Sequence, residues 1–450
     1  MNKRRGIVSL LLFVSYLSFS SSALSQPETA IFPQAESLPV SDGNIDLSEA
    51  VEAALQTHPS VRQADYLIEQ RLAEERIVRA EGRPVIEYSL MPGYNPDSNR
   101  DALLQLNVTG RVPVYDFGQR RSRRTSAALR TERYRHLQTT TQESVAVELV
   151  DQYLKFALWR DALAAADLQI EQLRLIRSRI NMRIAAGLAD RSDLQRTDVS
   201  ITRAEIQRNQ ASIQIEMAAD RIRSLSQLSG EPVATLDHVA AALMIAHVPE
   251  VESANEAPNV AAAWTDWQAS EADVSAAQAS RYPNISLGIT NSSYWMDDRG
   301  PLNTGSSFDN RTQFGVFLTG RVSLGGGARH QIASAQAVSN AAQSAYNFEI
   351  MRFDMAASEL QRRRLEAVAR GQGSAQVVLV LEQARDLYWQ EYILSKRRLS
   401  EVFDIEREIY QSRVEQLQAR ADEISVVAEQ LGIQGKLVST LQAYATGPAQ

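Results

Sequence analysis

The sequence predicts a mainly helical chain with membrane β-strands, built from two copies of one structural unit. Three observations support this fold class. Residues 119–186 contain no glycine or proline, and an unbroken helix of that length would span on the order of 100 Å. Four segments of about ten residues alternate apolar and polar side chains, as strands with one apolar face do. The same series of helices, strands and turns occurs in both halves of the chain.

The N-terminus predicts a secretory signal peptide. Three basic residues at positions 3–5 precede an apolar stretch over about residues 7–19, and small residues then lead to Ser25. We therefore expect residues 1–25 to be removed. An N-terminal membrane anchor is the less favoured alternative, because the apolar stretch is shorter than the ~20 residues of a membrane span. Residues 26–46 contain three prolines and are expected to form a linker.

The composition argues against several classes of function. The net charge is −7, and loss of the three basic residues changes it to −7 − 3 = −10, so no nucleic-acid partner is expected. The absence of cysteine excludes disulfides, thiolate metal sites, a cysteine nucleophile and a lipidated N-terminal cysteine. The five histidines lie far apart, and no serine-hydrolase, phosphate-loop or dinucleotide-binding motif is present. We predict no enzyme activity, catalytic residue, cofactor or metal site.

The first repeat is predicted over residues 47–257. It begins with a helical pattern that is interrupted near Pro59 and ends at about residue 81. Two strands joined by a polar loop follow within about residues 84–115, and apolar residues alternate regularly along the second strand. A strand-to-helix turn at Gly118 then leads into a long helical hairpin over residues 118–230.

This hairpin has the sequence repeat of a coiled coil. Its first helix places apolar residues at alternating steps of four and three from Val145 to Ile184. A stripe with this 3.5-residue period predicts a partner helix and a left-handed supercoil. Gly187 ends the first helix, and the returning stretch over residues 188–229 carries an alanine-rich stripe suited to close packing.

The second repeat, residues 258–431, follows the same order. Two strands are predicted within about residues 283–324, on either side of a polar loop over residues 291–310. Three glycines then form a strand-to-helix turn rather than a phosphate-binding loop, because no lysine accompanies them. They are Gly325, Gly326 and Gly327. A helical hairpin over residues 328–431 follows, with its tip at 395–401, and two glycines leave open whether its first helix is broken. They are Gly371 and Gly373.

Four strands with one apolar face cannot close a barrel in one chain, and an open edge cannot face lipid. Three copies would supply twelve strands, which is within the range of outer-membrane barrels. The same three copies would bring the long helices together as a cylinder. The strand pattern by itself also allows another arrangement, in which two hairpins form a small soluble sheet on a helical rod.

Short motifs in both repeats carry a resemblance to a known family. The chain resembles the TolC-like outer-membrane channels, the exit ducts of Gram-negative efflux pumps and type I secretion systems. The resemblance covers nearly all of the mature chain, and it is the order of the motifs rather than any one of them that is specific. The motifs are Leu47–Val51 with His58–Pro59, Val112–Gly118, Gly187–Asp193, Val322–Gly327 and Glu401–Asp404.

The resemblance implies a homotrimer in the outer membrane of a Gram-negative cell, surrounded there by outer-membrane lipid. It implies a twelve-stranded β-barrel and a long periplasmic α-helical tunnel. An equatorial collar would come from residues 231–257 and from a C-terminal tail, residues 432–450. The tips of the hairpins would form a periplasmic gate.

By position, the resemblance assigns three gate residues: Asp193 on the first hairpin, and Tyr392 and Arg397 on the second. We expect Arg397 to reach Asp193 of a neighbouring hairpin and hold the resting aperture closed. Glu401 and Asp404, three residues apart on one helix, would form two acidic pore rings that favour cations. The alternative is that both carboxylates are ordinary solvated residues of a coiled coil.

The implied partners are a periplasmic adaptor protein and an inner-membrane ABC or other export transporter. The adaptor is expected to contact five tip residues, of which Ser395 stands where the family usually has a second tip glycine. They are Gly187, Leu188, Ser395, Lys396 and Leu399. The missing lipidated cysteine favours type I secretion of an adhesin- or toxin-like protein over multidrug efflux. A periplasmic coiled-coil adaptor or scaffold is the alternative from another class.

Overall fold

The computed structural model describes residues 43–92, 101–243, 254–300, 303–320 and 325–446. The predicted signal peptide, residues 1–25, lies outside the described residues, as does the predicted linker up to residue 42. None of the helices described combines the length and the apolarity that a membrane span requires.

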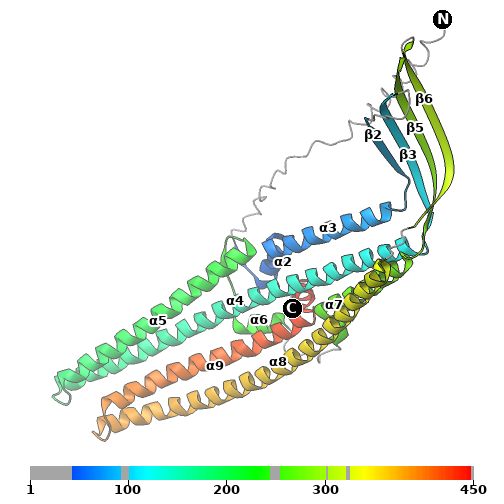
Figure 1. Cartoon of the computed structure of the whole chain (residues 1–450). Coiled ribbons are helices and arrows are strands. Elements are labelled where there is room, and N and C mark those ends of the chain that lie inside the picture. The colour runs from blue at the N-terminus through cyan, green and yellow to red at the C-terminus, as the bar shows by residue number, and fades with distance from the viewer. Residues whose placement is uncertain (1–42, 93–100, 244–253, 301–302, 321–324, 447–450) are drawn as a thin grey trace. The chain divides into compact units, whose positions relative to one another are not determined.

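The first repeat begins with two helices, continues with two strands and ends with a long helical hairpin (Figure 1). The helix predicted over residues 119–186 is α4, which runs unbroken to Ala185. The elements are α2 (Leu47–Thr57), α3 (Pro59–Ala80), β2 (Val85–Met91), β3 (Asp101–Tyr115), α4 (Gln119–Ala185) and α5 (Arg191–Ser226). Pro59 is the first residue of α3, where its missing N–H has no helical partner to lose.

The second repeat has the same order of elements. α4 and α8 both have 67 residues, and their first residues are 327 − 119 = 208 positions apart, so the duplication is preserved without insertion along the longest helix. α3 and α7 likewise both have 22 residues. The elements are α7 (Pro258–Ala279), β5 (Asn284–Gly300), β6 (Asn303–Thr319), α8 (Gly327–Ile393) and α9 (Leu399–Ile433).

For the second repeat, one prediction is wrong and one question that the sequence left open is answered. The prediction of a loop over residues 291–310 is wrong for the described part of that range, because β5 continues to Gly300 and β6 begins at Asn303, with an unbroken register between them. Polar side chains bond across the two strands there, as from Asn291 Nδ2 to Thr312 Oγ1 at 2.8 Å, so a polar stretch extends the ladder. Gly371 and Gly373 lie inside α8 and do not break it.

The four long strands form one antiparallel sheet in the order β2-β3-β5-β6. A second, two-stranded sheet pairs β1 (Asn44–Ile45) with β4 (Glu231–Pro232) in parallel. Ile45 is fully buried. The end of the predicted linker, residues 44–46, therefore belongs to the folded core.

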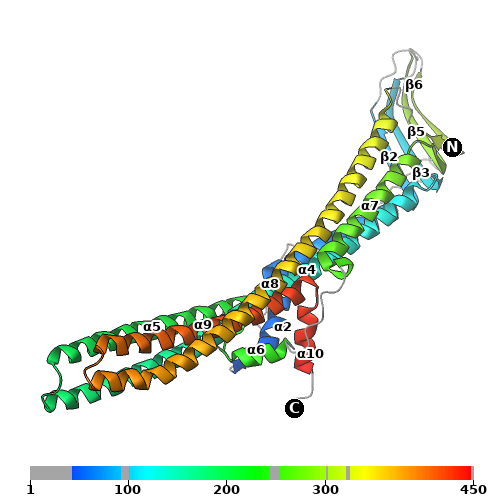
Figure 2. The same cartoon turned by 90° about the horizontal axis from the view of Figure 1, so that it is seen from below.

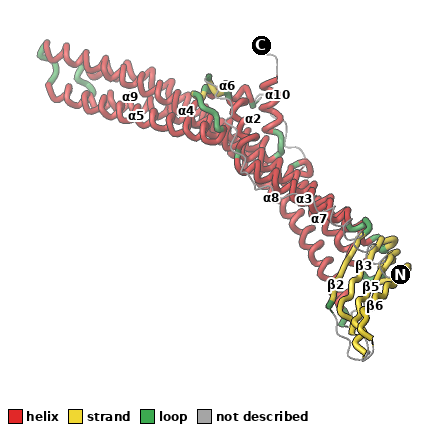
Figure 3. The backbone as a smooth tube through the Cα atoms, turned by 90° about the horizontal axis from the view of Figure 1, so that it is seen from above, coloured by secondary structure: helices red, strands yellow, loops and turns green. Residues whose placement is uncertain are grey.

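The helices lie side by side in a row, with α4 inside it. α4 contacts α3 and α5 on one side and α7 and α9 on the other (Figures 1 and 2). α8 contacts α7 and α9 and ends this row. The two hairpins, α4 with α5 and α8 with α9, run side by side. Figure 3 shows that their turns lie at the same end. The strands precede α4 and the first tip follows it, so α4 connects the sheet to the tips.

The largest apolar core forms where α4 meets α2, α5, α9 and two short helices. The two short helices are α6 (Leu236–Ala242) and α10 (Leu437–Thr446). A 3-10 turn, η3 (Ala254–Glu256), precedes α7 in the sequence. Tyr153 of α4 is fully buried in this core, and its hydroxyl donates to the carbonyl oxygens of Ile45 and Asp46, both at 3.1 Å. These hydrogen bonds attach Ile45 and Asp46, near the beginning of the described chain, to α4.

Candidate functional site at the hairpin tips

The two hairpin tips have the same backbone turn. At the first tip, Gly187 has φ +69°, and Leu188 N–H donates to Arg183 O at 2.8 Å. At the second tip, Ser395 has φ +56°, and Lys396 N–H donates to Glu391 O at 2.9 Å. Ser395 therefore takes the left-handed conformation that glycine takes at no steric cost. Serine at the second tip thus forms the same turn as glycine at the first.

The structure brings two of the three predicted gate residues together. Tyr392 of α8 donates its hydroxyl hydrogen to Oδ2 of Asp193 on α5, at 3.2 Å, and so joins the second hairpin to the first. Burial, and then the negative charge of Asp193, raise the pKa of Tyr392 above its usual value. The hydroxyl therefore keeps its proton and acts as the donor.

Arg397, the third predicted gate residue, is held within its own hairpin. Its guanidinium pairs with Glu391 and with Glu401, the latter at 2.7 Å, and lies 3.6 Å from the centroid of the Tyr388 ring. Within one chain the predicted contact between Arg397 and Asp193 is not made. A contact between Arg397 and Asp193 of a neighbouring chain stays a prediction, and it would compete with these internal partners.

Both predicted pore-ring carboxylates also have partners within the chain. Glu401 accepts from Arg397, and its other oxygen receives the backbone N–H of Arg398 at 3.5 Å as part of the cap of α9. Asp404 accepts from Arg407 at 2.7 Å. Their negative charge is therefore partly balanced at the tip.

Four of the five predicted adaptor contacts are exposed, and one is not. Gly187, Leu188, Ser395 and Lys396 lie at the surface of the turns. Leu399 is only 3% exposed and packs inside the tip cluster. The first residue of α9 thus turns its side chain inward in the single chain, and a contact between Leu399 and an adaptor stays a prediction.

An apolar cluster fills the space between the hairpins just behind the tips. α4 contributes four large residues, and α5 and α9 contribute three more. The buried members are Ile170, Leu173, Ile176, Ile180, Ala204, Leu399 and Val402. Three aromatic residues of α8 pack against them: Tyr388, Trp389 and Tyr392. The sequence showed the stripe on α4 but not that these aromatic residues would cover it.

A buried carboxylate lies between the hairpins. Glu406 of α9 is 4% exposed, and burial raises its pKa to about 6. Arg385 lies 4.0 Å away, at the outer limit of an ion pair. Gln169 of α4 donates its side-chain N–H to the backbone oxygen of Glu406 at 3.3 Å. The predicted acidic residues therefore miss the one carboxylate that is buried in this interface.

The strand-to-helix turns lie at the other end of the long helices. Gly118 and Gly326 have φ of +90° and +74° and are the residues before α4 and α8. Asp116 caps the start of α4, since it accepts from the backbone N–H of Arg120 at 2.8 Å. Gly325 is exposed, and Gly327 is the first residue of α8.

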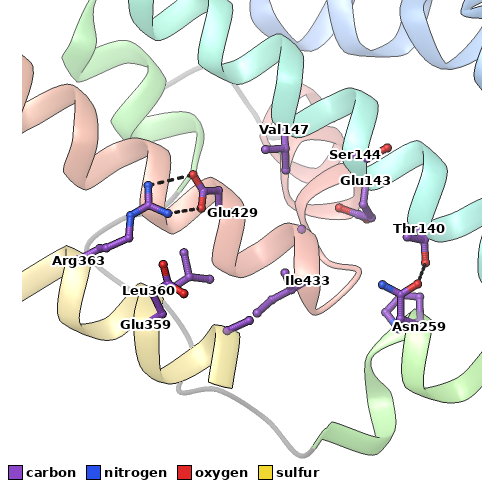
Figure 4. A pocket seen from close by; sticks show the side chains of 13 residues that line it. Thr140, Glu143, Ser144, Val147, Asn259, Glu359, Leu360, Arg363, Glu429 and Ile433 are labelled. Carbon is purple, nitrogen blue, oxygen red and sulfur yellow. Dashed lines mark hydrogen bonds and ion pairs between the residues drawn. The ribbon is translucent and has the colours of Figure 1, made fainter. Parts of the chain in front are cut away.

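A cavity of about 470 Å³ lies where the end of α9 meets the start of α7, between α4 and α8 (Figure 4). Its walls include Val147, Leu360 and Ile433. Arg363 donates to both oxygens of Glu429, at 2.7 and 3.2 Å, across one side of it. Over the described ranges, no group of three or more acidic or histidine side chains could hold a metal ion.

One buried carboxylate on the wall of this cavity anchors the C-terminal helix. Glu143 of α4 is 3% exposed and accepts from the backbone N–H groups of Leu437 and Val438, at 3.0 and 3.3 Å. These groups begin α10, so Glu143 serves as its cap. Burial raises the pKa of Glu143 to about 7.

The chain was compared with known proteins. Residues 50–226, from α2 to the end of α5, match a family model described as outer membrane efflux protein. No curated protein matches the sequence. Among solved structures, one of CusC is 14% identical with a TM-score of 0.73, covering 88% of this chain and 91% of that one. The outer membrane protein VceC from Vibrio cholerae is 15% identical with a TM-score of 0.70, covering 87% and 96%.

The resemblance to the TolC-like channels is thereby confirmed. A membrane protein from Pseudomonas aeruginosa, 18% identical over 86% of this chain and 93% of that one, gives the same fold at a TM-score of 0.70. The predicted fold class, long duplicated helical hairpins with four strands, is that of the TolC-like fold. The predicted outer-membrane location agrees with the name of the matched family. That family is one of transport proteins.

Proposed function

We propose that three copies of this chain form a channel-tunnel of the Gram-negative outer membrane, the exit duct of a tripartite export system. The proposal rests on the two edges of the described chain. Each consists of helices and a strand with no neighbour on one side, and one edge can pair with the other edge of a second copy. α8 and β6 form one edge, and α3, α5 and β2 form the other (Figure 1). Contacts of this head-to-tail kind close into a ring when the rotation between copies allows it.

The strand edges have compatible directions. Each neighbouring pair in the order β2-β3-β5-β6 is antiparallel, so β6 runs opposite to β2. β6 of one copy can therefore pair with β2 of the next in the same antiparallel manner. Three copies would continue this pattern through twelve strands and leave no edge exposed to lipid.

The helix edges carry exposed apolar stripes. Val380 and Leu387 of α8 and its C-cap Leu394 recur at seven-residue spacing and are 52, 53 and 64% exposed. On α5, three residues recur at the same spacing and are 52–54% exposed. They are Val199, Ile206 and Ile213. Exposed heptad stripes are costly in water and predict a partner helix on each edge.

The sheet has the surface that a membrane strand requires. Phe314, Val316 and Leu318 of β6 point to one face and are 80, 69 and 67% exposed. The opposite face is polar; on it, Thr109 and Thr290 lie within hydrogen-bond distance across β3 and β5, 3.4 Å apart. In the proposed barrel the apolar face meets outer-membrane lipid and the polar face lines water.

For the cargo, we propose type I protein secretion through an adaptor and an inner-membrane ABC transporter. The support is the absence of any cysteine, and so of a lipidated N-terminal cysteine. The name of the matched family favours the second candidate, efflux of small molecules through the same duct. In both cases the adaptor would dock on the exposed tip residues, and Asp193, Tyr392 and Arg397 would form the gate.

Conductance across a planar bilayer tests the proposal. The detergent-purified protein should give a small conductance that favours cations, and Asp193→Ala and Arg397→Ala should each raise it. An unchanged conductance in both variants would keep the channel but overturn the gate assignment. A protein that leaves cells without detergent and gives no conductance would instead be a periplasmic coiled-coil scaffold.

A further inference from the structure

We propose that Arg179 and Arg183 of α4 hold the two hairpin tips of one chain together by contact with the rings of Trp389 and Tyr392 of α8. These four residues are named the tip clasp. Arg179, Arg183 and Trp389 are then positioning residues of the gate. The consequence for transport rests on the proposed channel function, whereas the clasp itself rests on geometry alone.

The ring of Tyr392 lies between a cation and a carboxylate of the first hairpin. The guanidinium carbon of Arg183 is 5.5 Å from the ring centroid, and the hydroxyl bonds to Asp193 at 3.2 Å. Arg183 also donates to Leu188 O in the first turn, at 3.3 Å. A residue of the second hairpin is thus inserted between the two helices of the first, and Arg183 ties it to the turn itself.

One turn further from the tip, the same kind of contact is repeated. Arg179 lies 5.2 Å from the Trp389 ring centroid, and the rings of Trp389 and Tyr392 are 5.4 Å apart. The arginines are four residues apart and the aromatic residues three apart, so each pair lies on one helix face. The two contacts therefore act along one line between α4 and α8.

The ring contacts have features that a surface ion pair lacks. Nε of Arg183 is buried, with no hydrogen-bond partner among the described residues. Arg183 as a whole is half-buried, and its guanidinium carbon lies 5.5 Å from the centroid of the Tyr392 ring. A cation–π contact strengthens as water is removed from it, and burial reduces screening by salt.

Neighbouring arginines of α4 do not reach the second hairpin. Arg174 and Arg177 pair with Glu205 and Asp198 of α5, at 3.3 and 2.6 Å, within the first hairpin. The duplication does not repeat the clasp either. The positions 208 residues after Arg179 and Arg183 are Leu387 and Glu391. The clasp therefore uses arginines of the first repeat, and the equivalent positions of the second repeat carry no arginine.

The distance between the tips can be measured directly, because the chain contains no cysteine. Spin labels would be placed on Ala186→Cys and Lys396→Cys, both exposed at the tips. Labelled chains would be diluted with unlabelled protein so that pulsed electron paramagnetic resonance reports distances within one chain. The double variant Arg179→Gln/Arg183→Gln would be compared with Arg174→Gln/Arg177→Gln, which removes the same two charges from the same helix without touching the clasp.

The clasp predicts a narrow distance distribution in the parent protein and in Arg174→Gln/Arg177→Gln, and a broader, longer one in Arg179→Gln/Arg183→Gln. Conductance of Arg179→Gln/Arg183→Gln should rise by roughly tenfold if the parent is mostly closed, since two ring contacts are lost, one from the half-buried Arg183 and one from the exposed Arg179. Tyr392→Phe keeps the ring but loses the hydroxyl bond to Asp193, so it should broaden the distance distribution less than Tyr392→Leu, which also loses the ring contact.

An unchanged distance distribution in Arg179→Gln/Arg183→Gln would overturn the clasp. Equal loosening in Tyr392→Phe and Tyr392→Leu would also overturn it, because the hydroxyl bond to Asp193 would then hold the tips. Absence of conductance in every protein would count against the channel function, while the distances would still decide whether the clasp exists.

Discussion

The helices α4 and α8 occupy the same place in the two repeats, have the same length, and differ sharply in burial. Nineteen residues of α4 are buried, but only six of α8. α4 is covered on both sides by its own chain, whereas α8 ends the row of helices (Figure 2). Position by position, the buried Tyr153 and Glu143 of α4 correspond to the exposed Gln361 and Met351 of α8.

The two repeats therefore share the backbone of this helix, but the burial of its side chains differs between them. On α8, Leu360 is buried, and Met351 and Leu387 lie nine and twenty-seven residues from it. At ~3.6 residues per turn, both fall about a half turn out of phase and hence on the opposite face. The exposed face of α8 therefore points away from its own chain, which is where a ring of identical chains would place the next copy.

The largest effect should come from a charge on this exposed face. Leu387→Asp would bury a carboxylate in each of the three proposed contacts between copies, and we expect loss of the trimer. Gln411→Asp adds the same charge at an exposed position of α9, which lies inside the row of helices, and should leave the trimer intact. Light scattering of the detergent-purified protein gives the mass. A trimer that persists in Leu387→Asp would contradict the role given to α8.

A matched pair of truncations sharpens the contrast between the two helices. Leu149 of α4 is 0% exposed, and Leu149→Ala should cost about 2–5 kcal/mol of stability because it leaves a cavity in the core. Leu365 of α8 is 66% exposed within the chain. Leu365→Ala should lower the thermal midpoint only at protein concentrations where copies associate. Equal, concentration-independent losses would show that α8 is not at a subunit contact.

Of α4 and α8, only α4 carries a carboxylate, Glu143, whose pKa burial raises to about 7, so a pH effect on stability should distinguish the two helices. The pKa of Glu143 is about 7 in the folded chain, against an ordinary value of 4.5. Between these values the unfolded chain has lost a proton that the folded chain keeps, so this residue lowers stability as pH rises from 4.5 to 7. Glu143→Gln should remove this residue's share of the slope, most clearly between pH 6 and 7, above the pKa of about 6 of Glu406, and it should stabilise the protein at pH 8, because a neutral amide oxygen can still accept from α10. Thermal unfolding at several pH values, with Glu148→Gln on the same helix as control, tests this; a slope retained in Glu143→Gln would contradict it.

The smallest effect is expected at the tips. Ser395 and Gly187 share one left-handed turn, in which a residue other than glycine costs on the order of 1 kcal/mol. Ser395→Gly should therefore stabilise the second tip slightly, and Gly187→Ser should destabilise the first by a similar amount. Hydrogen exchange of the tip amides resolves such changes locally. Opposite signs would show that the turn at Ser395 needs its side chain.

The sequence predicts those features that depend on one helix or strand at a time. The length of α4 follows from the absence of glycine and proline, and the tips follow from Gly187 and its counterpart Ser395. The polar half of the β5–β6 hairpin was predicted as a loop because its hydrogen bonds need the partner strand, as between Asn291 and Thr312.

The candidate site was predicted in part, for the same reason. Tyr392 and Asp193 do meet, but Arg397 binds Glu391 and Glu401 of its own hairpin. Periodicity shows which face of a helix is apolar, not which helix covers it. The inward side chain of Leu399 and the ring contacts of Arg179 and Arg183 depend on that pairing and carry no local signal.

Direct imaging of the detergent-purified protein by electron cryo-microscopy tests the central claim, that identical chains close along the α8 edge around a lumen. We expect a threefold particle in which α8 of each chain packs against α3 and α5 of the next, with β6 beside the neighbouring β2. A monomer, or a twofold dimer with α8 against α8, would contradict it.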